Sequence, residues 1–215
     1  MRLELRCGES STKPTNFVLP HTTAAMSDYD SSRLKDFFSL HPRPTLDILV
    51  LGAPGSGKRS VCGRLAYGVF PFERDPTEDG QFRRLVQLFP PEVERSYHAV
   101  CTWTTILADP KEMIPGILRQ MVRDHDVFVL LYRTSDRATF EAVEALWRDL
   151  IAERGDSMLF VVANGGNDDV ISEREGRSMA DKLGATFWPM SAKTGHGAGD
   201  EQLAAMAKQM LLRKL

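Results

Sequence analysis

The pattern of hydrophobic and polar positions changes at about residue 45. Beyond it, short apolar segments alternate with amphipathic ones, which is typical of a largely parallel β-sheet covered by helices. A segment as apolar as VFVLLY, at residues 127–132, is typical of a strand buried on both faces. The pattern predicts about six strands, at residues 45–51, 82–89, 97–107, 127–132, 158–163 and 186–190. It predicts helices near residues 58–68, 111–123, 137–153, 172–183 and 200–213.

The first part of the chain lacks this organisation. Residues 1–43 are rich in Ser, Thr and Pro and show no sustained period, so we expect a flexible N-terminal extension there and one domain over residues 44–215. Four apolar residues of the extension stand near helical spacing: Leu34, Phe37, Phe38 and Leu40. The segment 32–40 is either a short helix that docks on the domain or a hydrophobic spot in a loose tail, and the sequence leaves both open.

Composition and charge narrow the classes of function. The chain carries 27 Lys and Arg against 29 Asp and Glu, a net charge of −2, so no strong field draws it to nucleic acid or to an anionic membrane. Cys7, Cys62 and Cys101 are far apart, which predicts neither a disulfide framework nor a zinc site. The sequence contains no secretory signal, no apolar membrane-spanning segment and no lipidation motif. We expect a cytoplasmic monomer with no lipid anchor encoded and no nucleic-acid partner.

A glycine-rich turn follows the first predicted strand. Residues 52–58, GAPGSGK, match the G-x-x-x-x-G-K pattern of phosphate-binding loops. The backbone N–H groups of such a loop enclose a phosphate, the next helix presents its positive N-terminus, and Lys58 would reach the outer phosphates. The predicted phosphate-binding residues are Gly52, Pro54, Gly55, Ser56, Gly57, Lys58, Arg59 and Ser60.

One position of this loop departs from the pattern. Arg59 stands where a Ser or Thr hydroxyl normally coordinates Mg²⁺. Ser60 lies about 100° further around the helix axis, so its hydroxyl should point away from the metal. We therefore expect a weakened Mg²⁺ site, with Arg59 itself supplying positive charge to the phosphates.

Further segments resemble the Ras family of small GTPases, and together with the phosphate loop they cover about residues 45–212. The sequence RDPTED at residues 74–79 resembles the first switch of that family. The resemblance implies that Thr77 binds Mg²⁺ and the γ-phosphate, so that its loop orders with GTP and relaxes on hydrolysis. The sequence WPMSAKTG at residues 188–195 resembles the loop that contacts guanine. It implies that the backbone of Ala192 binds the exocyclic oxygen of the base, braced by Ser191 and Lys193.

The guanine-reading motif N-K-x-D of the family is only partly present. After the fifth predicted strand the sequence reads NGGND, so Asn164 matches, Asn167 falls in register with the missing Asp, and Asp168 keeps a carboxylate one residue late. The loss of a buried polar reader should weaken the preference for guanine without abolishing phosphate binding. The choice between guanine and adenine stays open.

The second switch of the family, D-x-x-G followed by glutamine, is degenerate. Asp109 could hold Mg²⁺ through a water molecule, but Pro110 follows it and neither the glycine nor the glutamine is present. Pro54 also lies near the place that the hydrolytic water occupies in the family. We assign no catalytic residue and expect GTP hydrolysis to be slow or absent.

The resemblance implies an α/β fold, the three-layer P-loop NTPase fold of a small G domain, with a mostly parallel six-stranded sheet flanked by about five helices. It implies a signalling switch that binds GTP or GDP with a weakened Mg²⁺ site and contacts effector or regulator proteins through residues 70–82. An alternative is a pseudoGTPase, a protein-interaction module without a nucleotide cycle. The degenerate second switch favours this alternative, whereas Lys58, Thr77 and the Ser-Ala-Lys sequence favour the switch.

Overall fold

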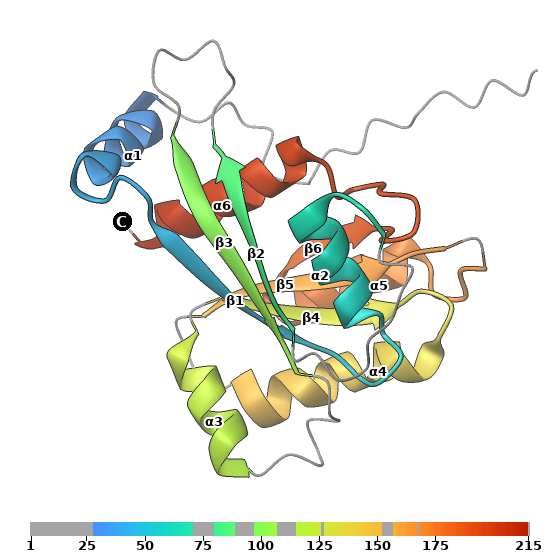
Figure 1. Ribbon diagram of the computed structural model, residues 1–215. Helices are drawn as coiled ribbons and strands as arrows, with labels where there is room; N and C mark the ends of the chain where they lie inside the picture. Colours follow the sequence, from blue (N-terminus) through green and yellow to red (C-terminus); the bar gives the residue numbers. More distant parts are fainter. Residues whose placement is uncertain are drawn as a thin grey trace, which may run out of the picture.

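The computed structural model describes residues 28–70, 80–88, 97–106, 115–125, 127–151, 157–166 and 168–214. The strands form one sheet in the order β2-β3-β1-β4-β5-β6, and only β2 runs antiparallel to its neighbour (Figure 1). The strands are β1 (Thr45–Leu51), β2 (Gln81–Gln87), β3 (His98–Thr105), β4 (Val127–Arg133), β5 (Met158–Asn164) and β6 (Thr186–Met190). The predicted α/β fold with a mostly parallel six-stranded sheet is therefore confirmed, with strand ends that differ by up to two residues.

Helices cover both faces of the sheet. Those in the described residues are α1 (Asp28–Leu40), α2 (Lys58–Tyr67), α3 (Pro115–Asp124), α4 (Arg137–Leu146), α5 (Glu173–Lys182) and α6 (Asp200–Lys214). The helix predicted over 137–153 is α-helical only as far as Leu146 and continues as a π-helical turn, η1 (Trp147–Ile151), which keeps Ile151 buried. None of the described helices is long and apolar enough to cross a membrane.

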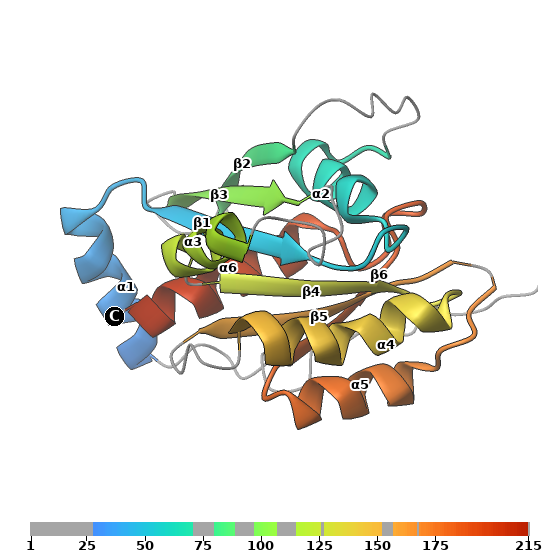
Figure 2. The same ribbon diagram turned by 90° about the horizontal axis from the view of Figure 1, so that it is seen from below.

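Alternate side chains of β1 enter two separate cores, because successive residues of a strand point to opposite faces. Leu46, Ile48 and Val50 belong to a core with α1, α2 and α6, whereas Leu49 and Leu51 belong to a core with α3, α4 and α5. Figure 2 shows α4 and α5 side by side along one side of the sheet. Burial on both faces explains why the strands are so continuously apolar.

Strand β1 leads directly into the candidate site. It pairs in parallel with β3 on one side and with β4 on the other, so Ile48 lies opposite Trp103 and Val127. Helix α2, which follows β1, and helix α3, which follows β3, belong to different cores, so the helices after these two neighbouring strands lie on opposite faces of the sheet. In open α/β sheets such a point of divergence leaves a crevice at the strand ends, and ligands bind there.

The segment 32–40, for which the sequence left two interpretations open, is part of α1 and packs on the domain. Leu34 is fully buried and Phe38 is 5% exposed, with the Phe38 ring 5.0 Å from that of Tyr97. Figure 1 shows α1 beside the carboxyl-terminal part of α6, which it contacts. The structure thus has the docked helix. The boundary between an extension and the domain stays a prediction, because residues 1–27 lie outside the described residues.

Candidate functional site

The loop between β1 and α2, residues 52–57, folds around the side chain of Lys58. Its Nζ donates to the carbonyl oxygens of Gly52 at 2.7 Å and Ala53 at 3.3 Å, and the side chain is buried. Gly55 and Gly57 have φ angles of +82° and +94°, a backbone conformation that favours glycine. A glycine-rich loop of this shape, with an ammonium group beside it, can bind a phosphate.

Gly57 also marks the start of α2, and no side chain caps the first turn of this helix. The positive end of the helix dipole lies at this turn, and it favours an anion there. A Cβ on Gly57 would overlap the Nδ2 atom of Asn164. The position thus requires glycine both for its φ angle and for the close approach of Asn164.

The side chain of Asn164, at the carboxyl end of β5, joins two loops. Its Nδ2 donates to the carbonyl oxygen of Ser56 at 3.3 Å, and its Oδ1 accepts from the backbone N–H of Ala192 at 3.2 Å. Its own carbonyl oxygen accepts from the backbone N–H of Thr134 at 3.2 Å. One amide side chain therefore links the 52–57 loop, the phosphate-loop candidate, to the 191–195 loop, which the resemblance predicts to contact the base.

The predicted base loop, residues 191–195, is a tight turn after β6. Gly195 N–H donates to the carbonyl oxygen of Ser191 at 2.8 Å, and Thr194 N–H donates to the Ser191 hydroxyl at 3.3 Å. Ser191 and Ala192 are buried, whereas Lys193 is exposed. The structure thus brings Ser191 and Ala192 to Asn164, as the resemblance implies.

The structure describes only some of the remaining residues that the sequence predicts for the site. Thr77, Asp109 and Asn167 lie outside the described residues, and Asp168 is exposed. The carboxylate that the structure orients here is Asp169, whose Oδ1 accepts from the Thr134 hydroxyl and, at 3.0 Å, from Gly166 N–H.

Asp169 was missed by sequence reasoning. The available signal was the end of β4, where the polar Thr134 is buried directly after a strand of buried apolar residues and needs a hydrogen-bond acceptor.

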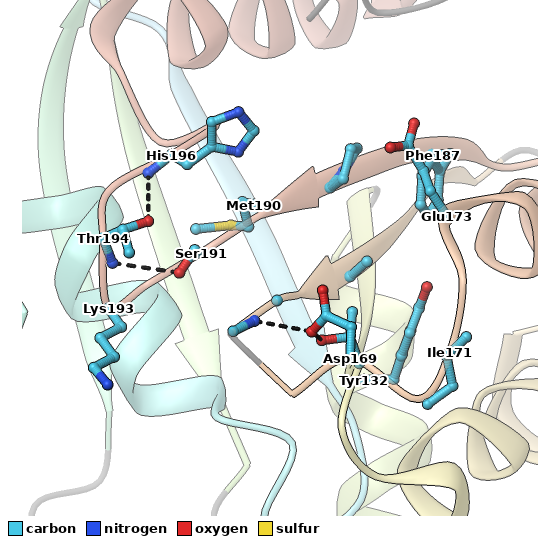
Figure 3. Close-up of a pocket in the computed structure, with 15 residues that line it drawn as sticks. Tyr132, Asp169, Ile171, Glu173, Phe187, Met190, Ser191, Lys193, Thr194 and His196 are labelled. Atoms are coloured by element: carbon cyan, nitrogen blue, oxygen red, sulfur yellow. Dashed lines mark hydrogen bonds between the residues drawn. The ribbon is translucent and has the colours of Figure 1, made fainter. Parts of the chain in front are cut away.

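A cavity of about 290 Å³ opens at the carboxyl ends of β4, β5 and β6 (Figure 3). Its walls include Tyr132, Asp169, Ile171, Phe187, Met190 and Lys193. The Tyr132 hydroxyl is buried and has no hydrogen-bond partner among the described residues. Burial raises the pKa of Tyr132, and the carboxylates of Glu175, Asp169 and Glu173 raise it further. The cavity thus combines apolar walls with hydrogen-bond acceptors, which suits a flat ring that carries N–H groups.

The start of α2 does not supply the donor set of a magnesium site. Mg²⁺ prefers oxygen ligands, and the residue after Lys58 is an arginine, whose guanidinium only donates hydrogen bonds. Within the described part of the chain, no group of three or more His, Cys, Asp or Glu side chains could hold a metal ion. The position after Lys58 therefore offers no oxygen ligand to Mg²⁺, and the other candidate ligands, Thr77 and Asp109, lie outside the described residues.

The sequence is similar to that of known proteins over most of its length. The family model described as "Ras family" matches residues 47–211, which include both loops. The chain is 27% identical over 164 residues to the GTP-binding protein Rheb homolog of Drosophila melanogaster, over 74% of this chain and 86% of the relative. It is 24% identical over 151 residues to the GTP-binding protein Rheb homolog 1 of Caenorhabditis elegans (68% and 69%), and 26% identical over 161 residues to Protein ras-1 of Neurospora crassa (69% and 68%).

Proposed function

Because the chain belongs to the Ras family of small GTP-binding proteins, we propose that it is a guanine-nucleotide-dependent signalling switch whose GTP hydrolysis is slow or absent. The observation that carries the proposal is the side chain of Asn164, which hydrogen-bonds the phosphate loop and the base loop at once. A nucleotide that spans these loops would meet its phosphate and base partners already arranged, which lowers the cost of binding.

The phosphates bind at the turn before α2. The Nζ of Lys58, now shared between two carbonyl oxygens, would turn to the outer phosphates, while the first N–H groups of α2 hold the inner ones. Arg59 adds a second cation at the position of the missing hydroxyl, so phosphate affinity depends less on Mg²⁺ than in the rest of the family. The proposed contacts are Gly52, Pro54, Gly55, Ser56, Gly57, Lys58, Arg59 and Ser60.

The base binds against Asn164 and the 191–193 segment, where the Ala192 N–H, which now donates to Asn164 Oδ1, would turn to the exocyclic oxygen of guanine. Asp169 supplies a carboxylate beside Asn164 that is already oriented by two hydrogen bonds. Guanine presents N–H donors on the edge where adenine presents a ring acceptor, so a carboxylate there favours guanine. Asn167 and Asp168, from the same loop, complete the proposed base contacts.

The hydrolytic step is poorly supported by this chain's own residues. Pro54 has no N–H to offer, Arg59 replaces a metal-binding hydroxyl, and Pro110 follows Asp109 in the degenerate second switch. These losses affect different parts of GTP hydrolysis, and their effects on its rate combine. GTP turnover should be on the order of 10⁻⁴ per second or slower, as in an unassisted small GTPase.

Partner proteins contact the first switch region, residues 70–82. Its described end leads into β2, at the edge of the sheet formed by the described strands. Phe82 lies near the exposed Tyr67, with 6.1 Å between ring centroids, and Leu85 is also exposed. An edge strand with exposed apolar side chains suits an effector or regulator protein.

A calorimetric titration of nucleotide-free protein tests the proposal, with GDP, GTP and ATP each added with Mg²⁺ and with EDTA. We expect GDP and GTP to bind more tightly than ATP, with a small effect of EDTA. Lys58→Ala should abolish phosphate binding, and Lys182→Ala, at an exposed lysine of α5 paired with Glu144, is the matched control. Failure of all three nucleotides to bind would contradict the proposal.

The second candidate, a pseudoGTPase that serves as a fixed interaction module, is favoured by Arg59 at the metal position. Hydrogen exchange across residues 70–82 separates the two functions. A switch requires different protection with GDP and with a non-hydrolysable GTP analogue. Equal protection in both complexes would favour the fixed module.

A further inference from the structure

Arg64, on the last turn of α2, donates to three backbone carbonyl oxygens. Its Nε donates to Ala192 at 2.7 Å, its Nη2 to Lys193 at 3.1 Å and its Nη1 to Gly68 at 2.6 Å. The first two acceptors belong to the base loop, and the third lies just beyond α2 itself. The planar guanidinium therefore joins the carboxyl-terminal end of α2 to a loop that is 128 residues further along the chain.

This contact closes a ring of interactions around the candidate site. Ser56 is joined to Asn164, Asn164 to Ala192, and Ala192 to Arg64, which stands on the same helix that begins after the phosphate loop. Ala192 is thus held through both of its backbone groups, its N–H by Asn164 and its carbonyl oxygen by Arg64. Its position relative to α2 depends on the two side chains together.

The shape of the base loop fits a guanidinium at this place. A Cβ on Gly195 would lie 3.6 Å from Nη1 and 3.7 Å from Cζ of Arg64, so the plane of the guanidinium rests against this residue. The φ angle of Gly195 is +84°, which favours glycine. A lysine ammonium at the same position carries its three N–H donors on one nitrogen and cannot match the planar fork that Ala192 and Lys193 accept.

We propose that Arg64 is a positioning residue for base recognition: it holds the 191–195 loop on α2 so that the Ala192 backbone faces the base. The inference rests on the proposed function. Gly165 and Gly166, which follow Asn164, carry no side chain that could pack on the base. The 191–195 loop therefore carries a larger share of base recognition in this chain, and its placement matters more.

The test compares Arg64→Ala and Arg64→Lys with Arg84→Ala. Arg84 is a matched control because it also binds a carbonyl oxygen of α2, that of Leu65 at 3.0 Å, and pairs with Asp200, without touching the 191–195 loop. We expect Arg64→Ala to weaken GDP binding by about tenfold or more, since both of its charge-assisted hydrogen bonds to the 191–195 loop are lost. Binding of pyrophosphate, which has no base, should change less than about twofold. Arg64→Lys should restore part of the GDP affinity, and Arg84→Ala should leave the ratio of the two affinities unchanged.

A second measurement, on nucleotide-free full-length protein, does not depend on GDP binding. The backbone amides of Thr194 and Gly195 should exchange hydrogen about tenfold faster in Arg64→Ala and at the wild-type rate in Arg84→Ala. An equal loss of GDP and pyrophosphate affinity in Arg64→Ala, or an unchanged exchange rate in this loop, would overturn the proposal. If the wild type binds pyrophosphate but not GDP, the proposed function fails, and the exchange rates alone decide the role of Arg64.

Discussion

The Oδ1 atom of Asn164 accepts a hydrogen bond of 3.2 Å from the backbone N–H of Ala192, which lies 28 residues further along the chain. The Nδ2 atom of Asn164 donates to the carbonyl oxygen of Ser56. We expect Asn164→Ala to lower the free energy of unfolding by about 2 kcal/mol, because two hydrogen bonds of about 1 kcal/mol each are lost. Urea denaturation measures the change. Asp168→Ala, at an exposed residue of the same connection, should change the stability by less than about 0.5 kcal/mol. Equal effects of the two substitutions would contradict the role of Asn164 as a link.

Helix α1 supplies a buried leucine and an exposed one, which makes a matched pair. Leu34 is fully buried and Leu40 is 79% exposed. Leu34→Ala should destabilise the protein by about 2–5 kcal/mol, because it removes buried methyl groups and leaves a cavity. Leu40→Ala should change the stability by less than about 0.5 kcal/mol. Thermal or urea unfolding of the two variants decides whether α1 is part of the folded domain, and a small effect of Leu34→Ala would mean that it is not.

The Tyr132 hydroxyl lies directly beneath Gly176 of α5, where a Cβ would overlap it and would come within 2.6 Å of Phe187. Tyr132→Phe should keep the stability unchanged or raise it by about 1 kcal/mol, because it removes a buried hydroxyl that lacks a partner among the described residues. Gly176→Ala should destabilise by about 1–3 kcal/mol through overpacking. The double variant should recover part of this loss. Strictly additive free energies of unfolding would show that the two positions do not interact.

The pH dependence of stability should carry a contribution from Glu175. The backbone N–H of Ser172, with the Arg137 guanidinium and the Ser172 hydroxyl, lowers the pKa of Glu175 to about 2 from the ordinary value of 4.5. A lowered pKa in the folded state stabilises the protein above about pH 4.5, and this stabilisation is lost as the pH falls through about 2.

The measurement is urea denaturation of the wild type and Glu175→Gln at several pH values. The stability difference between them should be largest near neutral pH and shrink between about pH 4.5 and pH 2. Arg137→Ala should move the loss of stability to higher pH, because it removes one of the groups that lower the pKa. A difference that is constant over the whole range would contradict the assignment.

The strands were predictable because a strand that is buried on both faces is a run of consecutive apolar residues. In β4 every residue from Val127 to Tyr132 is buried, and the segment is continuously apolar. The glycine-rich turn before α2 was predictable for the same reason, since its glycines and Lys58 are neighbours in the sequence. The end of the helix predicted over 137–153 was not, because a π-helical turn continues the same apolar stripe and leaves no sequence signal at Leu146.

The contacts that assemble the candidate site were beyond sequence reasoning. Thr134, which binds Asp169, precedes it by 35 residues, and Arg64 precedes Ala192 by 128. Asp168 and Asp169 are adjacent and chemically identical, so only the path of the loop decides which carboxylate turns toward Thr134. In the same way, Leu34 and Phe38 stand near helical spacing, but the sequence left open whether they form a helix that docks on the domain.

By itself, the sequence determined the local features of this protein: the alternation of strands and helices, the glycine-rich turn before α2 and the resemblance that its motifs carry. These depend on interactions between residues a few positions apart, and they leave regular periods in the chain. Only the tertiary structure decided that α1 docks beside α6, that Asp169 is the oriented carboxylate and that Arg64 donates to the 191–195 loop. Each of these requires two segments distant in sequence to meet with defined geometry, and hydrogen bonds over such separations leave no period that a single sequence can reveal.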